Sequence, residues 1–127
     1  MLTEVRLRRR PEGTGWCFLE ESRRYGDYAV VGVAALMRLD TDGQCADVAV
    51  TLFGVGEAPY VVVHATALLE GQVPRETLFT AVGQAAADGI EPEDDVHASA
   101  AFRRHLSAVL TRRALLTAAE RAGSVPH

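Results

Sequence analysis

A short segment near the N-terminus gathers the side chains best suited to chemistry: Arg23, Arg24, Tyr25, Gly26 and Asp27. Guanidiniums can hold an anion, and a phenol or a carboxylate can exchange a proton with a bound ligand. The glycine loosens the backbone and an apolar run follows directly, which is typical of a loop at the mouth of a buried strand. We therefore expect a loop that faces a ligand or a partner, with a solvated loop of local ion pairs as the alternative.

The other candidate catalytic groups are dispersed along the chain. Asp27, Tyr28 and His64 could act as acids or bases if the chain is an enzyme, and Tyr25 and Tyr60 could then contact the substrate. Each also has a structural interpretation, because an Asp before a strand often caps a turn and a His between apolar residues often packs in a core. The residues alone leave both interpretations open.

The cysteines and histidines show no metal-ligand pattern. No two of the four histidines have a compact ligand spacing with a nearby cysteine, so no metal site is expected. Cys17 and Cys45 are isolated and are expected to be buried thiols, although a disulfide between them stays open because sequence does not give its geometry. The chain also lacks a glycine-rich phosphate loop, a nucleophile elbow and a kinase signature.

Hydrophobic periodicity predicts strands in the first half of the chain. Imperfect alternation at residues 2–7 predicts a first strand, and residues 16–21 fit either a short strand or a helical turn. Residues 28–39 and 46–53 are expected to pair as an antiparallel hairpin, because Asp42-Gly43 between them is a strong turn signal.

The second half of the chain changes to a helical period. A short helix is expected to stop at Gly71, and an apolar stripe predicts a helix from Pro74 to near Gly89. A long helix follows near Ser99, preceded by carboxylates at residues 94–95 that suit the positive end of its dipole. The face of this helix opposite its apolar stripe is expected to carry Arg103, Arg104, Arg112 and Arg113.

Together these elements predict an α+β fold, with an antiparallel three- to four-stranded sheet packed against about three helices, as one domain over residues 1–127. The net charge of −4 argues against a nucleic-acid surface, which needs a basic excess. No apolar run has the length of a membrane span or of a signal-peptide core, so a cytoplasmic protein without membrane contact is expected.

Residues 18–29 follow the pattern F-x-E-x-x-R-R-x-G-D-[FY]-A. This pattern resembles the C-terminal domain of the flavoprotein (medium) subunit of molybdenum hydroxylases, the carbon monoxide dehydrogenase and xanthine dehydrogenase group. The resemblance continues in the same order through nearly the whole chain. It includes Trp16, residues 31–35, the hairpin turn at 42–43, the glycine turn at 54–56 with Pro59, and residues 68–71, 95–106 and 110–115.

The resemblance implies an antiparallel sheet packed against three helices. It also implies that FAD is held mainly by two earlier subdomains, while the loop at residues 23–27 approaches the flavin. Because residues 1–127 contain no subdomain that binds the FAD phosphates, we expect no FAD on this chain alone, and FAD only in complex with a partner chain. The run from Pro59 to Val63 departs from the family's Pro-x-Arg-Ala, which predicts a more apolar surface or pocket there.

Two functions follow as hypotheses. In the first, the chain is a free-standing, non-catalytic module that completes a split molybdenum-hydroxylase flavoprotein subunit, and is thus an oxidoreductase subunit with an FAD-domain partner chain. In the second, it is a repurposed cyclase, isomerase or dehydratase of secondary metabolism, with a small organic ligand in the cleft between sheet and helices. Either leaves apolar surface that a partner chain, a homo-oligomer or a ligand must cover.

Overall fold

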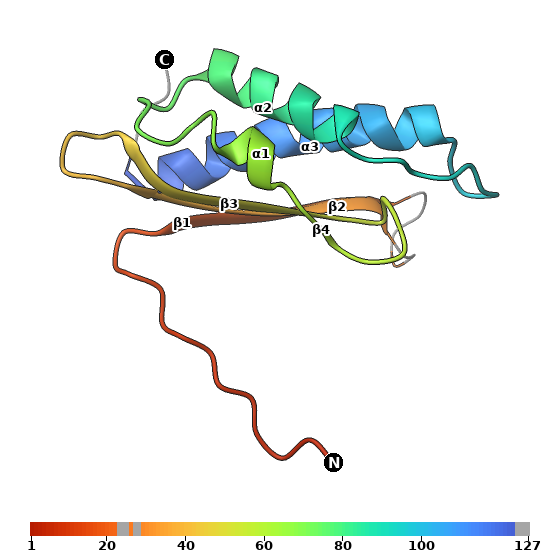
Figure 1. Cartoon of the computed structure of the whole chain (residues 1–127), viewed down its shortest axis with the longest axis horizontal. Helices are drawn as coiled ribbons and strands as arrows, with labels where there is room; N and C mark the ends of the chain where they lie inside the picture. Colours follow the sequence, from red (N-terminus) through yellow and green to blue (C-terminus); the bar gives the residue numbers. More distant parts are fainter. Residues whose placement is uncertain (23–25, 27–28, 124–127) are drawn as a thin grey trace.

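A computed structural model of the chain describes residues 1–22, 26 and 29–123 (Figure 1). Four strands form one antiparallel sheet in the order β1-β2-β3-β4. Their bounds are β1 Gly15–Ser22, β2 Ala29–Leu39, β3 Cys45–Phe53 and β4 Tyr60–Val61. The order of strands before helices and the antiparallel pairing confirm the predicted α+β class.

The hairpin between β2 and β3 turns where the sequence predicts it. Gly43 has a φ of +78°, a conformation that glycine adopts without steric cost. The carboxylate of Asp40 accepts hydrogen bonds from the backbone N–H groups of Asp42 and Gln44, at 2.9 and 3.0 Å. These bonds close the turn and fix the register of the two longest strands.

Helices cover one face of the sheet and leave the other bare (Figure 1). The helices are α1 Val63–Thr66, α2 Glu76–Asp88 and α3 Ala100–Arg121. Helix α3 packs on β1 and β2, α2 packs beside α3, and α1 joins α2 to β3. No helix among the described residues is long and apolar enough to cross a membrane.

Two expectations from the sequence need correction or completion at the N-terminus. The strand predicted at residues 2–7 does not form, and every side chain there is exposed. Alternation alone does not hold a strand, because its backbone groups need a neighbouring strand to bond with. The ambiguous segment that begins at Trp16 is a strand, since it pairs with β2 from Gly15 to Ser22.

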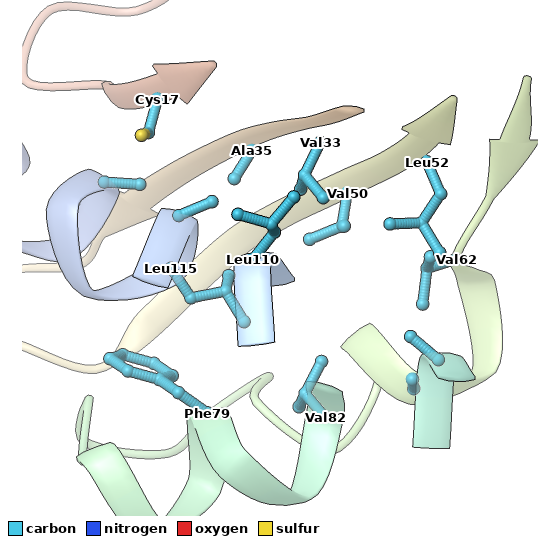
Figure 2. Packing of buried hydrophobic residues seen from close by; sticks show 14 of the residues in the cluster. Cys17, Val33, Ala35, Val50, Leu52, Val62, Phe79, Val82, Leu110 and Leu115 are labelled. Carbon is cyan, nitrogen blue, oxygen red and sulfur yellow. The ribbon is translucent and has the colours of Figure 1, made fainter. Parts of the chain in front are cut away.

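The core fills the layer between the sheet and the two long helices (Figure 2). Val33 and Val50 of the sheet, Phe79 of α2 and Leu115 of α3 are almost completely excluded from water. Each such side chain contributes about 1.5–3 kcal/mol through burial. The layer is thin at one point, where a Cβ on Gly15 would lie 1.8 Å from the backbone oxygen of Ala118.

Candidate functional site

The loop singled out by the sequence lies mostly outside the described residues. Arg23, Arg24, Tyr25, Asp27 and Tyr28 belong to the undescribed part, so their predicted roles stay predictions. Within that loop the structure describes Gly26, which is exposed in a turn with a φ of +87°. Apart from its two chain neighbours, no described atom lies within 4 Å of where a Cβ on Gly26 would be.

The other two candidate residues lie near the start of the helical part. Tyr60 stands on β4 opposite the buried Leu52 and packs against the core from the helical side. Its hydroxyl comes close to the end of α2, because a Cβ on Gly89 would lie 2.8 Å from it. His64 is exposed on α1. Tyr60 therefore has a packing role, while His64 is not packed as the structural interpretation expected.

Arg103 connects several segments at the end of the sheet where β2 begins. It comes from the first turn of α3 and is only 7% exposed. Its Nη1 donates to the backbone oxygens of Val30 at 2.6 Å and of Gly54 at 2.9 Å, and its Nη2 donates to Asp95 Oδ2 at 2.7 Å. One guanidinium thus joins the start of β2, the turn after β3 and the loop before α3.

Asp95 is the partner that makes this burial tolerable. Its carboxylate accepts hydrogen bonds from the backbone N–H groups of His97 and Ala98 at 2.9 and 3.0 Å, as well as from Arg103. These bonds, those from the backbone first, lower the pKa of Asp95 to about 2. Asp95 is therefore charged wherever the protein is folded near neutral pH.

The start of α3 is capped as the sequence predicts. Ser99 accepts a hydrogen bond from the backbone N–H of Phe102 at 3.1 Å. Asp94 accepts one from the backbone N–H of Ala100 at 2.6 Å. The similarity segment at residues 95–106 is thus a capping motif together with the buried arginine that the cap positions.

From the sequence Arg103 is expected on the exposed face of α3, because charged residues are usually exposed. That expectation is wrong, since Arg103 is buried. The helical spacing held the correct signal. Arg103 lies four residues before Ser107 and seven before Leu110, and all three are buried on the same stripe. The prediction is confirmed for Arg112, which is partly exposed and forms an ion pair with Glu76 at the helix surface.

A hollow of about 520 Å³ lies beside Arg103. Its lining includes Glu57, Glu91, Glu93 and Asp95, so the lining carries mostly negative charge. Three of the five N–H donors of Arg103 already bond to protein oxygens, and the surrounding carboxylates make the hollow unsuited to an anion. No group of three or more His, Cys, Asp or Glu side chains suited to a metal ion occurs among the described residues.

The two cysteines are free and buried, as expected from the sequence. Cys45 Sγ lies 4.0 Å from Met37 Sδ in the core. Burial raises the pKa of Cys45 to about 11, and the charge of Asp40 adds to the effect. Cys45 is accordingly a packed thiol without nucleophilic character near neutral pH.

The face of the sheet that the helices leave bare is largely apolar, and we call it the outer face. Its large apolar side chains are Trp16, Phe18, Leu36, Phe53 and Val61, and the same face also carries Glu20, Ala34, Arg38, Asp47, Ala49 and Thr51. The rings of Phe18 and Phe53 have centroids 6.1 Å apart, and they meet across β2 because Gly32 has no side chain between them. Val61 is 60% exposed and supplies the apolar surface predicted for the run after Pro59.

The fold is that of one domain of a larger flavoprotein subunit. Carbon monoxide dehydrogenase from Hydrogenophaga pseudoflava superposes with a TM-score of 0.83 and 28% identity, over 87% of this chain and 38% of that one. Quinoline 2-oxidoreductase from Pseudomonas putida 86 gives a TM-score of 0.82 and 33% identity, over 90% and 39%. The chain belongs to the CO dehydrogenase flavoprotein C-terminal domain family, whose sequence profile matches residues 16–118.

Curated relatives are subunits of the same kind. The chain is 33% identical over 122 residues to the 6-hydroxypseudooxynicotine dehydrogenase complex subunit alpha of Paenarthrobacter nicotinovorans. It is 29% identical over 123 residues to the carbon monoxide dehydrogenase medium chain of Afipia carboxidovorans. These alignments cover 96% of this chain in both cases, but 41% and 42% of the relatives. The chain therefore spans about two fifths of the relatives it matches.

Proposed function

We propose that this chain acts as a free-standing C-terminal domain that completes the medium subunit of a molybdenum hydroxylase, with the flavin held by a partner chain. The observation that carries the proposal is the match to one domain, and to about two fifths, of medium subunits. The chain would be non-catalytic alone and would act by closing one side of the flavin site.

The described residues are compatible with a flavin beside the loop. Gly26 is exposed, and Arg103 fixes β2 just after the loop by donating a hydrogen bond to the backbone oxygen of Val30. By the family resemblance, Arg23, Arg24 and Asp27 would face the flavin from this loop. The flavin would supply hydride and electron transfer, while this chain would orient one edge of the ring and exclude water.

A small-molecule enzyme has less support. That hypothesis places the substrate between sheet and helices, where Phe79, Leu115 and Val33 are packed with almost no exposure. His64, a candidate acid or base in that hypothesis, lies exposed on α1. The packing of this layer favours the module over a cyclase or an isomerase.

The test is to isolate the tagged chain from its own host and to identify what is bound. We expect a second polypeptide that matches the remaining part of a medium subunit, and flavin absorbance in the complex. The control is the same chain produced alone in a heterologous host, which should carry no flavin. A chain that purifies from its host without such a polypeptide contradicts the proposal.

A further inference from the structure

The outer face of the sheet has the composition of a covered surface, although none of the described helices and strands covers it. Trp16 is 56% exposed, Phe18 is 51% exposed and Val61 is 60% exposed. The strand register places them in adjoining rows, with Phe18 and Val61 in one row and Trp16 and Leu36 in the next. Scattered apolar side chains are normal on a surface, but a contiguous group indicates an interaction site.

The two long helices on the other side do not have this character, although Val63 of α1 and Leu68 and Val73 after it are exposed, at 62%, 49% and 39%. The exposed positions of α2 are polar or small: Glu76, Thr77, Thr80, Ala81, Gln84 and Asp88. On α3 the large exposed apolar side chain is Phe102, at 47%. A surface of this kind suits water, so the two sides of the domain differ in what they are built to meet.

The path of the chain indicates which partner reaches the outer face. The family match begins at residue 16, within β1, and the matched domain is the C-terminal one of its subunit. The rest of a medium subunit therefore precedes β1 in the relatives. In Figure 1 the residues before β1 leave the sheet on the side opposite the helices. The preceding part of the subunit would thus meet the outer face.

The edge of the outer face is arranged as interfaces are. The guanidinium carbon of Arg121 lies 4.5 Å from the centre of the Trp16 ring, a cation–π contact. Arg38 and Asp47 form an ion pair at 2.6 Å on the same side of the sheet. Beside Trp16 and Leu36 lies a hollow of about 430 Å³, and the segment before β1 lines its other side with Arg10, Pro11, Gly13 and Thr14. An apolar centre, a charged rim and a hollow for an incoming side chain are typical of a protein–protein contact.

We infer that the outer face is the surface on which the chain binds the flavin-binding part of a medium subunit, supplied by another polypeptide. The inference rests on the proposed function and adds to it the surface and the anchoring residues Trp16 and Phe18. Their aromatic rings would insert into the partner, and the charges around them would set the orientation.

The test compares two matched variants of the tagged chain in its own host, Phe18→Glu on the outer face and Phe102→Glu on α3. Both replace a half-exposed Phe by the same charge, so both should keep the circular dichroism and melting temperature of the parent. We expect Phe18→Glu to lower the amount of co-purified flavin-binding chain by about tenfold or more, since a charge would be buried at the contact. Phe102→Glu should leave that amount unchanged.

Trp16 provides a second measurement because it is the single tryptophan of the chain. A chain with an isotopic or fluorinated label on that indole is exchanged into the isolated complex. The signal of the label should then become protected from a soluble quencher or broadening agent. An indole as accessible in the complex as in the free chain contradicts the inference.

The outcomes separate the two proposals. If the parent chain binds no flavin-binding polypeptide, the proposed function fails. If it does, and Phe102→Glu rather than Phe18→Glu abolishes binding, the proposed function stands and the outer-face inference is wrong. If the parent chain forms only a homodimer that Phe18→Glu converts to a monomer, the occupant of the outer face is a second copy and the inference is again wrong.

Discussion

The two faces of this sheet are both apolar, but only one is part of the folded core. On the inner face Val33, Val50 and Leu52 lie under α2 and α3 and are excluded from water. On the outer face Trp16 and Phe18 stand on the same sheet and are about half exposed. Sheets with apolar residues on both faces are usually covered on both. The inner face therefore carries stability, and the outer face is the surface that we propose for assembly.

The largest expected effect contrasts one phenylalanine from each environment. Phe79→Ala removes a ring that is completely buried between α2 and the sheet and should lower the free energy of unfolding by about 3–5 kcal/mol. Phe18→Ala on the outer face should change it by about 0.5 kcal/mol or less. Urea unfolding of the free chain measures both. Equal losses would show that the outer face is part of the core.

The next contrast sets a buried arginine against a partly exposed one at the helix surface. Arg103→Met leaves the backbone oxygens of Val30 and Gly54 without their donor and should cost about 2–4 kcal/mol. Arg112→Met removes a surface ion pair with Glu76 and should cost about 1 kcal/mol or less. The same unfolding experiment at neutral pH provides the comparison. A small loss for Arg103→Met would mean that the loop end of the sheet does not depend on this guanidinium.

Alkaline pH should weaken the inner face through Cys45. Its pKa is about 11 in the folded chain against an ordinary 9.0, so the unfolded chain loses this proton first. The free energy of unfolding should therefore fall as pH rises from 9 towards 11, by at most about 1.4 kcal/mol per pH unit. Unfolding under reducing conditions at several pH values measures this slope.

The control for that slope is Cys45→Ala. This variant keeps all other titrating groups of the parent chain, so the difference between the two pH profiles reports Cys45 alone. Parallel profiles would show that the buried thiol does not link stability to pH.

The smallest expected effect is on the outer face. Arg38 and Asp47 are paired across β2 and β3 with largely exposed side chains. Asp47→Asn should change the free energy of unfolding by about 0.5 kcal/mol or less, and less still at high salt. A larger loss would indicate that this rim is part of the fold rather than of an interface.

The sequence predicts most of this fold because local signals and the final structure agree. Asp42-Gly43 marks the central hairpin, Ser99 caps α3, and the apolar stripes of α2 and α3 have the helical period. The same local signals fail for residues 2–7, where an alternating pattern lacks a neighbouring strand. Whether a strand finds a partner depends on residues distant in sequence, which periodicity does not contain.

The candidate site was less accessible from sequence. Arg103 is buried because Val30, Gly54 and Asp95 converge on it, and the most distant of them, Val30, lies 73 positions away in the chain. The apolar character of Trp16 and Phe18 was visible in the sequence, yet which face of β1 the helices cover was not. The roles predicted for residues 23–27 rest on the family resemblance and stay predictions.

The end of α3 has a further consequence for the edge strand β1. Arg121 donates to the backbone oxygen of Trp16 at 2.7 Å, so one acceptor on β1 is already satisfied by a charged side chain. At the other edge β4 contributes only Tyr60–Val61. A charged side chain bonded to one edge strand and a very short strand at the other edge both discourage the addition of further strands at the edges of the sheet. The sheet is thereby protected from growing sideways into an aggregate while one of its faces stays bare.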